Sequence, residues 1–445
     1  MTSEPRTAAE PAITDGSGRI ALIALAGLFF ALLILFSIIQ PLGRTPDEAA
    51  HMQYVQFLAE HRRLPIFAPV GGGEGGYEAQ HPPFYYALAA VVHAATGGLD
   101  ERWRWHVLRW WTALLVGGGA LLVCRAFFRH LWPDAPRVAF LGTAATVLMP
   151  LTILYAGYIN PDGLAFLLVT VALYLSLLTV TEEPSTTRAA LLGLSIGAAA
   201  LTKLSAAVAV VPAIGAWVLL ARRGRLRGRF GDVALSLGIA FAVSAWWYIR
   251  NLMYYGTPFI HTAAPYGSAL DNAFASGRFG FFAWLAARET YLSTWIQRGW
   301  LPAGPAEWCF YGFITVLLVG AVIGWSARKT DDTDHEDSLS ERRRRGAVLS
   351  LLTLVAVVAG QQSAFWLSDV EFNAGGRYAL IAMAGIVHMT MGGWSRLLSR
   401  RGLVTLCAWF VVALVLASLL SAWQILHVLN PRYAPGWQLF HFPPG

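Results

Sequence analysis

Long runs of apolar residues constrain the fold of this chain more than any other feature of its sequence. The first run covers residues 20–39, and an α-helix of that length crosses a bilayer core of about 30 Å. Hydrophobic residues make up 56% of the chain and charged residues 13%, whereas a soluble domain carries about 25% charged residues. The sequence therefore predicts an all-α polytopic membrane protein.

Eleven apolar segments are predicted to cross the membrane as helices. The weakest of them, residues 189–201, has only 13 residues and could instead fuse with a neighbouring segment. The eleven segments are residues 20–39, 107–128, 138–158, 163–180, 189–201, 205–220, 233–248, 308–325, 347–367, 379–393 and 403–426.

One more apolar stretch, residues 84–96, is predicted to lie at the membrane interface, because a helix of this length reaches only about 20 Å. The positive-inside rule places basic loops in the cytoplasm and requires an even number of spans between them, which supports this interpretation. The alternative, in which residues 84–96 cross and residues 189–220 form one span, stays open. The basic clusters lie at residues 125–137, 222–229, 328–345 and 396–402.

This topology divides the chain into a membrane domain and its loops. Basic cytoplasmic loops account for the net charge of +7, so no nucleic-acid partner is needed to explain it. The predicted parts are a disordered cytoplasmic tail (1–19), a transmembrane domain (20–428), two external loops (41–105 and 251–306), a charged cytoplasmic loop (326–346) and a short external tail (429–445).

Six polar motifs lie at the predicted external ends of these segments. Ionisable groups at membrane depth are unfavourable, and by default they mark functional sites. Because all six motifs fall on one face, they predict a single shared site. The motifs are PDEAAH (46–51), QHPP (80–83), NPDG (160–163), TKLS (202–205), RN (250–251) and EFNAGGRY (371–378).

Each motif also has a purely structural interpretation, which the sequence leaves open. Asp47 could cap the helix that follows it, and Glu48 could stabilise the first turn of that helix through the helix dipole. His81 could hold a Pro-Pro turn, and NPDG is an ordinary turn sequence. Three basic residues could simply reach the interface or cap a helix end: Lys203, Arg250 and Arg377.

The motifs and their order resemble those of GT-C glycosyltransferases that use lipid-linked sugars. The chain is similar to the protein O-mannosyltransferase family and to a group of related bacterial membrane proteins. PDEAAH resembles the Asp-Glu pair of that family's first external loop, QHPPFYY its His-Pro-Pro-Leu motif, and YAGYINPDGLA its second acidic motif. ALTKLS, WWYIRNLMYYGTP and GGRYAL resemble motifs of the bacterial group. The resemblance covers residues 20–428 and implies a GT-C fold.

The resemblance also implies a function. The expected reaction moves a hexose or pentose from a polyprenyl-phosphate donor to a glycan, lipid or protein acceptor, at the external face of the bacterial inner membrane. One base and one leaving phosphate imply a single displacement, with inversion at the anomeric carbon. No cofactor is certain, and a divalent metal ion stays an open alternative.

By the same resemblance, Asp47 is expected to be the catalytic base, with Glu48 and His81 shaping its pocket. The choice between Asp47 and Glu48 as the base stays open. Asp162 and Asn160 are expected to form a second acidic site or to bind a metal. The residues expected to bind the donor phosphate are Lys203, Arg250, Arg377 and Tyr378.

A transporter or lipid flippase without transferase activity is the main alternative function. Broken helices and charges within the membrane would also suit alternating access between two halves of a transporter. The sequence contains no internal repeat, however, and its charged motifs lie at one surface rather than at mid-depth. These two features favour the transferase.

Overall fold

The computed structural model describes residues 15–68, 72–260, 267–297, 299–327, 334–368 and 375–433. Nearly all the regular structure in these residues is helical. The only strands that they contain are β1 (Phe67–Ala68) and β2 (Gly72–Gly73), which pair with each other. The prediction of an all-α protein is therefore confirmed.

Eight helical segments of the described residues are long and apolar enough to cross a membrane. Each of them overlaps a segment predicted from the sequence. They are built from α1 (Asp15–Ile39), α4 (Glu101–Thr112) with α5 (Gly118–Leu131), α8 (Asp162–Thr181), α10 (Val210–Ala221), α11 (Phe230–Tyr255), α14 (Pro305–Ser326), α15 (Asp334–Leu367) and α17 (Arg400–Gln424). Short helical turns extend or join them: η2 (Ala113–Gly117), η3 (Leu204–Ala209), η4 (Arg227–Arg229), η6 (Ile425–Leu429) and α18 (Asn430–Tyr433).

The other three predicted spans are bent or short. Residues 138–158 form α6 (Pro136–Val147) and α7 (Pro150–Ala156), which are bent by 59° because a proline cannot continue the hydrogen bonds of the preceding helix. α9 (Thr186–Thr202) has 17 residues, and α16 (Met383–Trp394) has 12. Length and composition support eight or nine spans in the described residues, so the predicted number of eleven is not confirmed.

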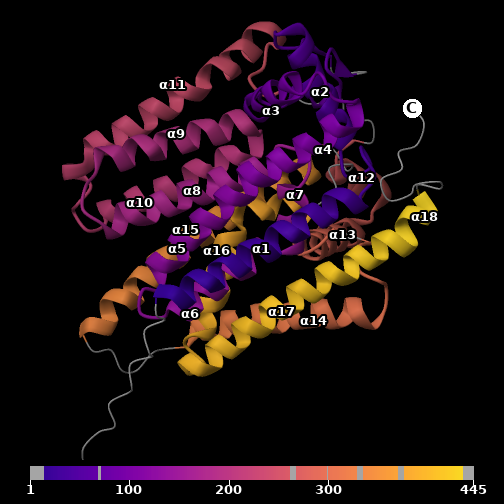
Figure 1. The fold of residues 1–445 in the computed structure, drawn as a ribbon. Helices are drawn as coiled ribbons and strands as arrows, with labels where there is room; N and C mark the ends of the chain where they lie inside the picture. The colour runs from indigo at the N-terminus through magenta and orange to yellow at the C-terminus, as the bar shows by residue number, and fades with distance from the viewer. Residues whose placement is uncertain are drawn as a thin grey trace, which may run out of the picture.

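The segment between α1 and α4 forms a small helical layer at one end of the bundle (Figure 1). It contains α2 (Glu48–His61), the 3₁₀ turn η1 (Tyr77–Gln80) and α3 (Phe84–Ala95). α3 has 12 residues, too few to cross a bilayer, and it packs against α2, α4 and α9. The stretch predicted not to cross is thus a short helix at the end of the bundle.

α8 lies in the centre of the bundle and packs against α5, α9, α10 and α15. The most apolar part of α8 is 67% buried, the highest share among the eight spans. The 3₁₀ turn η5 (Gly376–Ala382), which precedes α16, also packs against α8. The first residue of α8, the break after α9 and the start of η5 therefore meet at the same end of the bundle.

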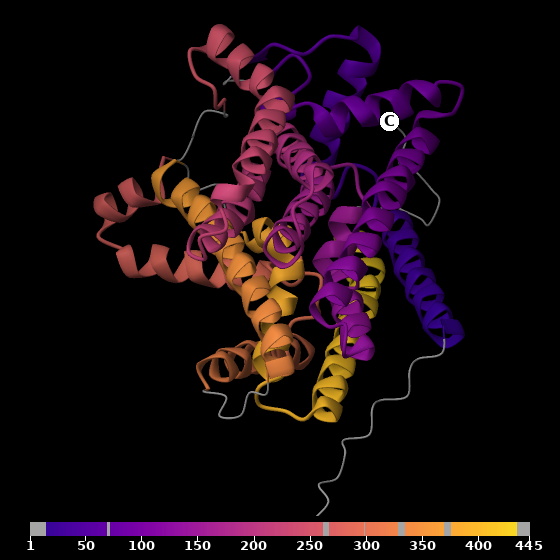
Figure 2. The same ribbon diagram turned by 90° about the vertical axis from the view of Figure 1, so that its left-hand side faces the viewer.

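After α11, the chain forms a helical hairpin beside the main bundle. α12 (Ala269–Ser276) and α13 (Phe279–Ser293) pack against each other, and they also contact α15 and η5, respectively. Figure 2 shows this hairpin projecting sideways from the bundle. The hairpin is thus attached to the segment that leads into α16.

Arginines close the opposite end of the bundle, where α5 and α8 end. The last four carbonyl groups of a helix have no partner within that helix, and these guanidinium groups supply one. The donors Arg229, Arg342, Arg343 and Arg345 bind the carbonyl oxygens of Thr179, His130, Leu131 and Val180, respectively.

Candidate functional site

Asp47 lies between α1 and α2, and its carboxylate contacts two other parts of the chain. Its Oδ1 accepts a hydrogen bond from Tyr77 OH at 2.8 Å, and its Oδ2 pairs with Arg377 Nη1 at 3.0 Å. The Asp47 backbone is left-handed, with φ of 61°, and its side chain makes no hydrogen bond to the start of α2. The helix-capping interpretation is therefore wrong for this side chain.

Glu48, the next residue, is buried and has different partners. Its carboxylate forms two hydrogen bonds with Arg109, from Nε at 2.8 Å and from Nη2 at 2.6 Å. Burial alone would raise the pKa of Glu48, but the guanidinium of Arg109 outweighs burial and lowers it. Glu48 therefore anchors this part of the chain and remains ionised.

Arg109, on α4, is a residue that sequence reasoning did not single out. Its side chain has no exposed surface, and besides Glu48 it binds the carbonyl oxygens of Ser37, Gln40 and Pro41. It thereby ties the end of α1 to the start of α2. The available signal was an arginine inside an apolar, tryptophan-rich run, where a charge is unfavourable unless it is paired.

Two more residues that sequence reasoning missed, His51 and Glu78, lie beside His81. The Glu78 Oε2 atom is 2.8 Å from His81 Nε2 and 3.7 Å from His51 Nδ1. His51 Nδ1 also forms a 2.9 Å hydrogen bond with Tyr86 OH. A signal for His51 was present, because it follows Asp47 by four residues and such residues share one face of a helix.

The charges in this cluster influence one another. Burial would raise the pKa of Glu78, but the imidazoles of His51 and His81 and the ammonium of Lys203 outweigh burial and lower it. For His51, burial is the largest influence and lowers the pKa of the imidazole. The charges around Glu78 therefore favour its ionised form.

Asp162 and Lys203 form a buried ion pair, with 2.6 Å between Oδ1 and Nζ. Lys203 stands at the break between α9 and η3 with an extended backbone, as predicted for a turn between two helices. Its Nζ lies 5.3 Å from the centre of the Tyr378 ring, and the Arg377 guanidinium lies 5.4 Å from the same ring. Tyr378 thus contacts both cations.

Asn160 builds the turn that places Asp162 at the start of α8. Its Oδ1 accepts hydrogen bonds from the backbone N–H groups of Asp162 and Gly163, at 2.9 and 3.2 Å. Its Nδ2 donates to the carbonyl oxygens of Tyr155 and Tyr158. The Asn160 side chain is therefore bound to the backbone of its own turn.

Arg250 was also predicted to bind the donor phosphate, but its contacts are with residues outside the cluster around Asp47. Its Nη2 donates to the carbonyl oxygen of Pro65 at 2.8 Å. Its guanidinium lies 5.2 Å from the ring centre of Trp247 and 5.0 Å from that of Tyr254. The structure thus gives Arg250 a role in holding the segment before β1, rather than a contact with Asp47.

Three side chains of the site have the right chemistry to hold a metal ion. One ligand atom each from Asp47, His51 and Glu78 lies within 4.8 Å of the other two. Two carboxylates and one imidazole suit a divalent cation such as Zn²⁺ or Mn²⁺. Asp162 and Asn160, which the sequence suggested for a metal, are not part of this group.

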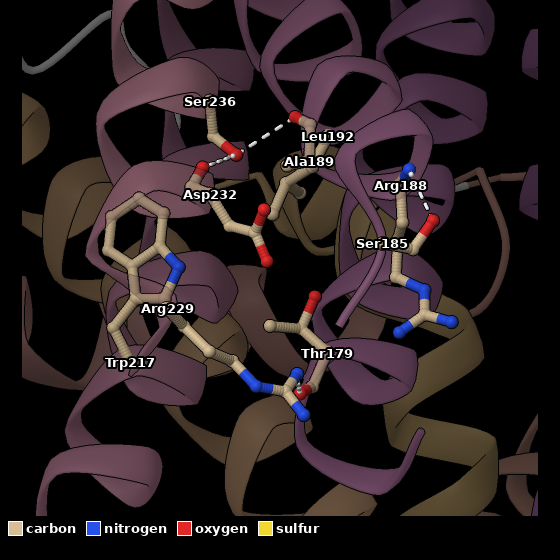
Figure 3. Close-up of a pocket in the computed structure, with 9 residues that line it drawn as sticks. All are labelled: Thr179, Ser185, Arg188, Ala189, Leu192, Trp217, Arg229, Asp232 and Ser236. Atoms are coloured by element: carbon tan, nitrogen blue, oxygen red, sulfur yellow. Dashed lines mark hydrogen bonds between the residues drawn. The ribbon is translucent and has the colours of Figure 1, made fainter. Parts of the chain in front are cut away.

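A small cavity lies at the other end of α8, and Figure 3 shows the residues that line it. Its volume is about 10 Å³, which is room for about one water molecule. Arg229, Asp232 and Thr179 are among the residues that line it, and Arg229 donates to the Thr179 carbonyl. This cavity is too small for a substrate, so the candidate site is the cluster around Asp47.

Several solved structures align with this chain at low sequence identity. The oligosaccharyltransferase AglB from Archaeoglobus fulgidus, in its apo form, aligns with a TM-score of 0.56 and 14% identity over 98% of this chain and 61% of its own. AglB in complex with an inhibitory peptide and a dolichol-phosphate gives a TM-score of 0.52 and 12% identity, over 94% and 56%. ArnT from Cupriavidus metallidurans bound to undecaprenyl phosphate gives 0.43 and 16%, over 90% and 78%.

No protein-family profile matches the sequence, and no curated protein does. The chain spans less than two thirds of AglB, since it covers 61% of the apo protein and 56% of the complex. At these identities the likeness concerns the fold, and the predicted GT-C fold of a polytopic membrane protein is confirmed.

Proposed function

We propose that the protein is a glycosyltransferase that moves a sugar from a polyprenyl-phosphate donor to a glycan, lipid or protein acceptor. The observation that carries this proposal is the contact between Asp47 and Arg377, whose side chains are 34% and 31% exposed at the edge of a buried charged cluster. A carboxylate can take a proton, and a guanidinium can bind two phosphate oxygens. The fold supports the same class, since AglB has been solved with a dolichol-phosphate.

In the proposed reaction Asp47 is the general base. It takes the proton of an acceptor hydroxyl while the acceptor oxygen bonds to the anomeric carbon and the bond to the phosphate oxygen breaks. The electron pair leaves on the phosphate, whose charge Arg377 stabilises. This single displacement inverts the anomeric carbon.

Lys203 and Tyr378 support the phosphate in this mechanism. The Lys203 side chain is 7% exposed and the Arg377 side chain is 31% exposed, so we assign the first phosphate contact to Arg377 and the second to Lys203. Tyr378 lies within cation–π distance of both and fixes their separation. The turn of Asn160 holds Asp162 in place, and Asp162 balances the charge of Lys203 when no donor is bound.

A divalent cation fits the same site. Asp47, His51 and Glu78 would hold it, and a bound cation would neutralise charge on the departing phosphate. His81, at 2.8 Å from Glu78, would orient that ligand. Treatment with EDTA is expected to lower sugar transfer at least about tenfold, and added Mn²⁺ or Zn²⁺ to restore it. Unchanged transfer after EDTA would assign the phosphate charge to Arg377 and Lys203 alone.

We place the site at the external face of a bacterial inner membrane, with the N-terminus in the cytoplasm. The described residues of the basic clusters lie at the end of the bundle away from α2 and α3 (Figure 1). Basic loops remain in the cytoplasm during insertion, so the Asp47 end faces outward. An external site suits a donor whose sugar is attached to a membrane lipid.

Asp47→Asn tests this function. The purified protein in lipid nanodiscs would receive a radiolabelled polyprenyl-phosphate sugar and a cell-envelope extract as the source of acceptor. Transfer is expected to fall roughly 10²–10⁴-fold, while binding of undecaprenyl phosphate persists. Glu60→Gln is the matched control, because it removes an exposed carboxylate from α2, the helix that follows Asp47. Near-normal turnover in Asp47→Asn would move the search to Glu48 and Asp162.

The transporter alternative can be tested with the same protein. In sealed vesicles, a transporter would move a fluorescent polyprenyl phosphate between leaflets without forming a glycosylated product. The transporter would be favoured if the wild type and Asp47→Asn moved the lipid equally and neither transferred sugar.

A further inference from the structure

An apolar cavity of about 490 Å³ lies between α13, α14, α15 and α16. Leu318, Leu354, Val358 and Ile386 line it from three of these helices, and Ala379 contributes to its wall from η5. The volume is typical of a ligand pocket, which ranges over about 300–1,000 Å³. The site around Asp47 has none of these lining residues, so the cavity is a separate feature.

A few polar groups interrupt the apolar wall. The indole N–H of Trp295 is buried and finds no hydrogen-bond partner among the described residues. The Thr290 hydroxyl accepts a hydrogen bond from Gln362 Nε2 at 2.9 Å. A cavity with so few polar groups suits a hydrocarbon chain better than a sugar or a nucleotide, whose hydroxyl or phosphate groups would lose their hydration.

α13 forms one wall of the cavity, and the hairpin that it makes with α12 carries exposed aromatic side chains. Phe274, Phe279, Phe281 and Trp284 have between 41% and 69% of their surface exposed. Exposed apolar groups of this size mark surfaces that contact a membrane or another protein. We therefore place the hairpin against lipid, so that a hydrocarbon chain can enter the cavity from the bilayer.

Gly376 joins the wall of this cavity to the candidate site. Its N–H donates to Ser293 Oγ at the end of α13, with a separation of 2.5 Å. A Cβ atom on Gly376 would overlap Thr294 Oγ1 and the carbonyl oxygen of Thr290. The backbone of η5 therefore touches α13 directly, and Arg377 is the next residue.

We propose that this cavity binds the isoprenoid tail of the lipid-phosphate donor and that α13 transmits tail binding to Arg377 through Gly376. The inference rests on the proposed function for the identity of the head group. The choice of occupant follows from continuity along the chain, because the lining residue Ala379 comes two positions after Arg377. A phosphate held by Arg377 places its own hydrocarbon chain at the cavity.

Filling the cavity tests the tail site. Val358→Trp places a large ring in the cavity, and Val355→Trp is its matched control, because Val355 is on the same helix and 56% exposed. Val358→Trp is expected to weaken binding of tritiated undecaprenyl phosphate in nanodiscs at least about tenfold. Its binding of geranyl phosphate, which has a short tail, and its thermal stability should match those of the control.

Two results would overturn the tail site. One is equal affinity of Val358→Trp and Val355→Trp for undecaprenyl phosphate, or no binding of that lipid by the wild type. The other is equal displacement by phosphatidylglycerol, which would identify a general lipid site. The measurement needs no sugar transfer, so tail binding by a protein that transfers no sugar would refute the proposed function and leave the tail site standing.

The link to Arg377 needs its own test. Undecaprenol carries the tail without a phosphate, and it is expected to raise the affinity of the wild type for inorganic phosphate about fivefold or more. Ser293→Ala removes the hydrogen bond to Gly376 and should abolish this enhancement while undecaprenol still binds. Gly376→Ala is a second disruption of the same contact. An undiminished enhancement in Ser293→Ala, or no enhancement in the wild type, would overturn the link.

Discussion

At the scale of single residues, the site depends on an aspartate in a conformation that L-amino acids disfavour. A left-handed backbone destabilises a non-glycine residue by roughly 1–2 kcal/mol, and Asp47 adopts one with φ of 61°. Strain of this kind persists only where surrounding contacts determine the geometry. Here the bonds between Glu48 and Arg109 fix the chain on one side of Asp47, and its carboxylate meets Tyr77 and Arg377 on the other.

The two arginines expected to bind phosphate are now predicted to differ in their effect on phosphate binding. Arg377→Ala should weaken binding of undecaprenyl phosphate at least about tenfold, because a guanidinium bound to phosphate contributes about 1.5–3 kcal/mol. Arg250→Ala should change this affinity much less, since Arg250 binds the Pro65 carbonyl instead. Equilibrium binding in nanodiscs measures both. Equal losses in the two variants would contradict the separation of their roles.

At the scale of elements, the junction of α1, α2 and α4 was the part that sequence reasoning could not foresee. Glu48 and Arg109 are 61 positions apart, and no periodicity relates two such distant residues. Hydrophobic runs, in contrast, are local properties, so most helices were predicted correctly. The bend between α6 and α7 was also foreseeable, because Pro150 lies inside the predicted span and proline interrupts a helix.

This junction predicts a pH dependence of stability. The pKa of Glu48 is lowered in the folded protein from its ordinary value of 4.5, so its ion pair stabilises fully above about pH 4.5, and this contribution is lost as the pH falls through the folded pKa. Glu48→Gln leaves Arg109 buried without its partner charge and should reduce the free energy of unfolding by about 3–5 kcal/mol at neutral pH.

Thermal unfolding in detergent, measured from neutral pH downward, tests this prediction. The melting temperature of the wild type should fall more steeply at acidic pH than that of Glu48→Gln. Glu60→Gln, which removes an exposed carboxylate from α2, should behave like the wild type. If Glu48→Gln melted at the same temperature as the wild type at neutral pH, the ion pair of Glu48 and Arg109 would contribute little to stability.

At the scale of the whole molecule, the sequence predicted that polar motifs far apart in the chain would meet at one place. The described residues bring Asp47, His81, Asp162, Lys203 and Arg377 into one cluster, whereas Arg250 binds elsewhere. Glu78 could not be placed from the sequence, because only the folded turn η1 brings it to the face of α2. Residues 371–374, which begin the last motif, lie outside the described residues.

The same arrangement predicts where α3 lies relative to the membrane. A cysteine at Gly98, just after α3, should react with a membrane-impermeant maleimide added to intact cells, because α3 is too short to cross. The measurement uses a variant without the three native cysteines. Labelling that occurs only after permeabilisation would place this loop in the cytoplasm and divide the polar motifs between two faces.

The arginines that bind the carbonyl groups at the ends of α5 and α8 have two roles, one during membrane insertion and one in the folded protein. In the topology that we propose, their charge marks the loops that stay in the cytoplasm while the chain is being inserted. After assembly the same groups are hydrogen-bond donors to helix ends. A substitution that erased the insertion signal at Arg343 or Arg345 would thus also remove a partner of a helix end. A descendant of this protein could reverse its orientation only by rebuilding both helix ends at the same time.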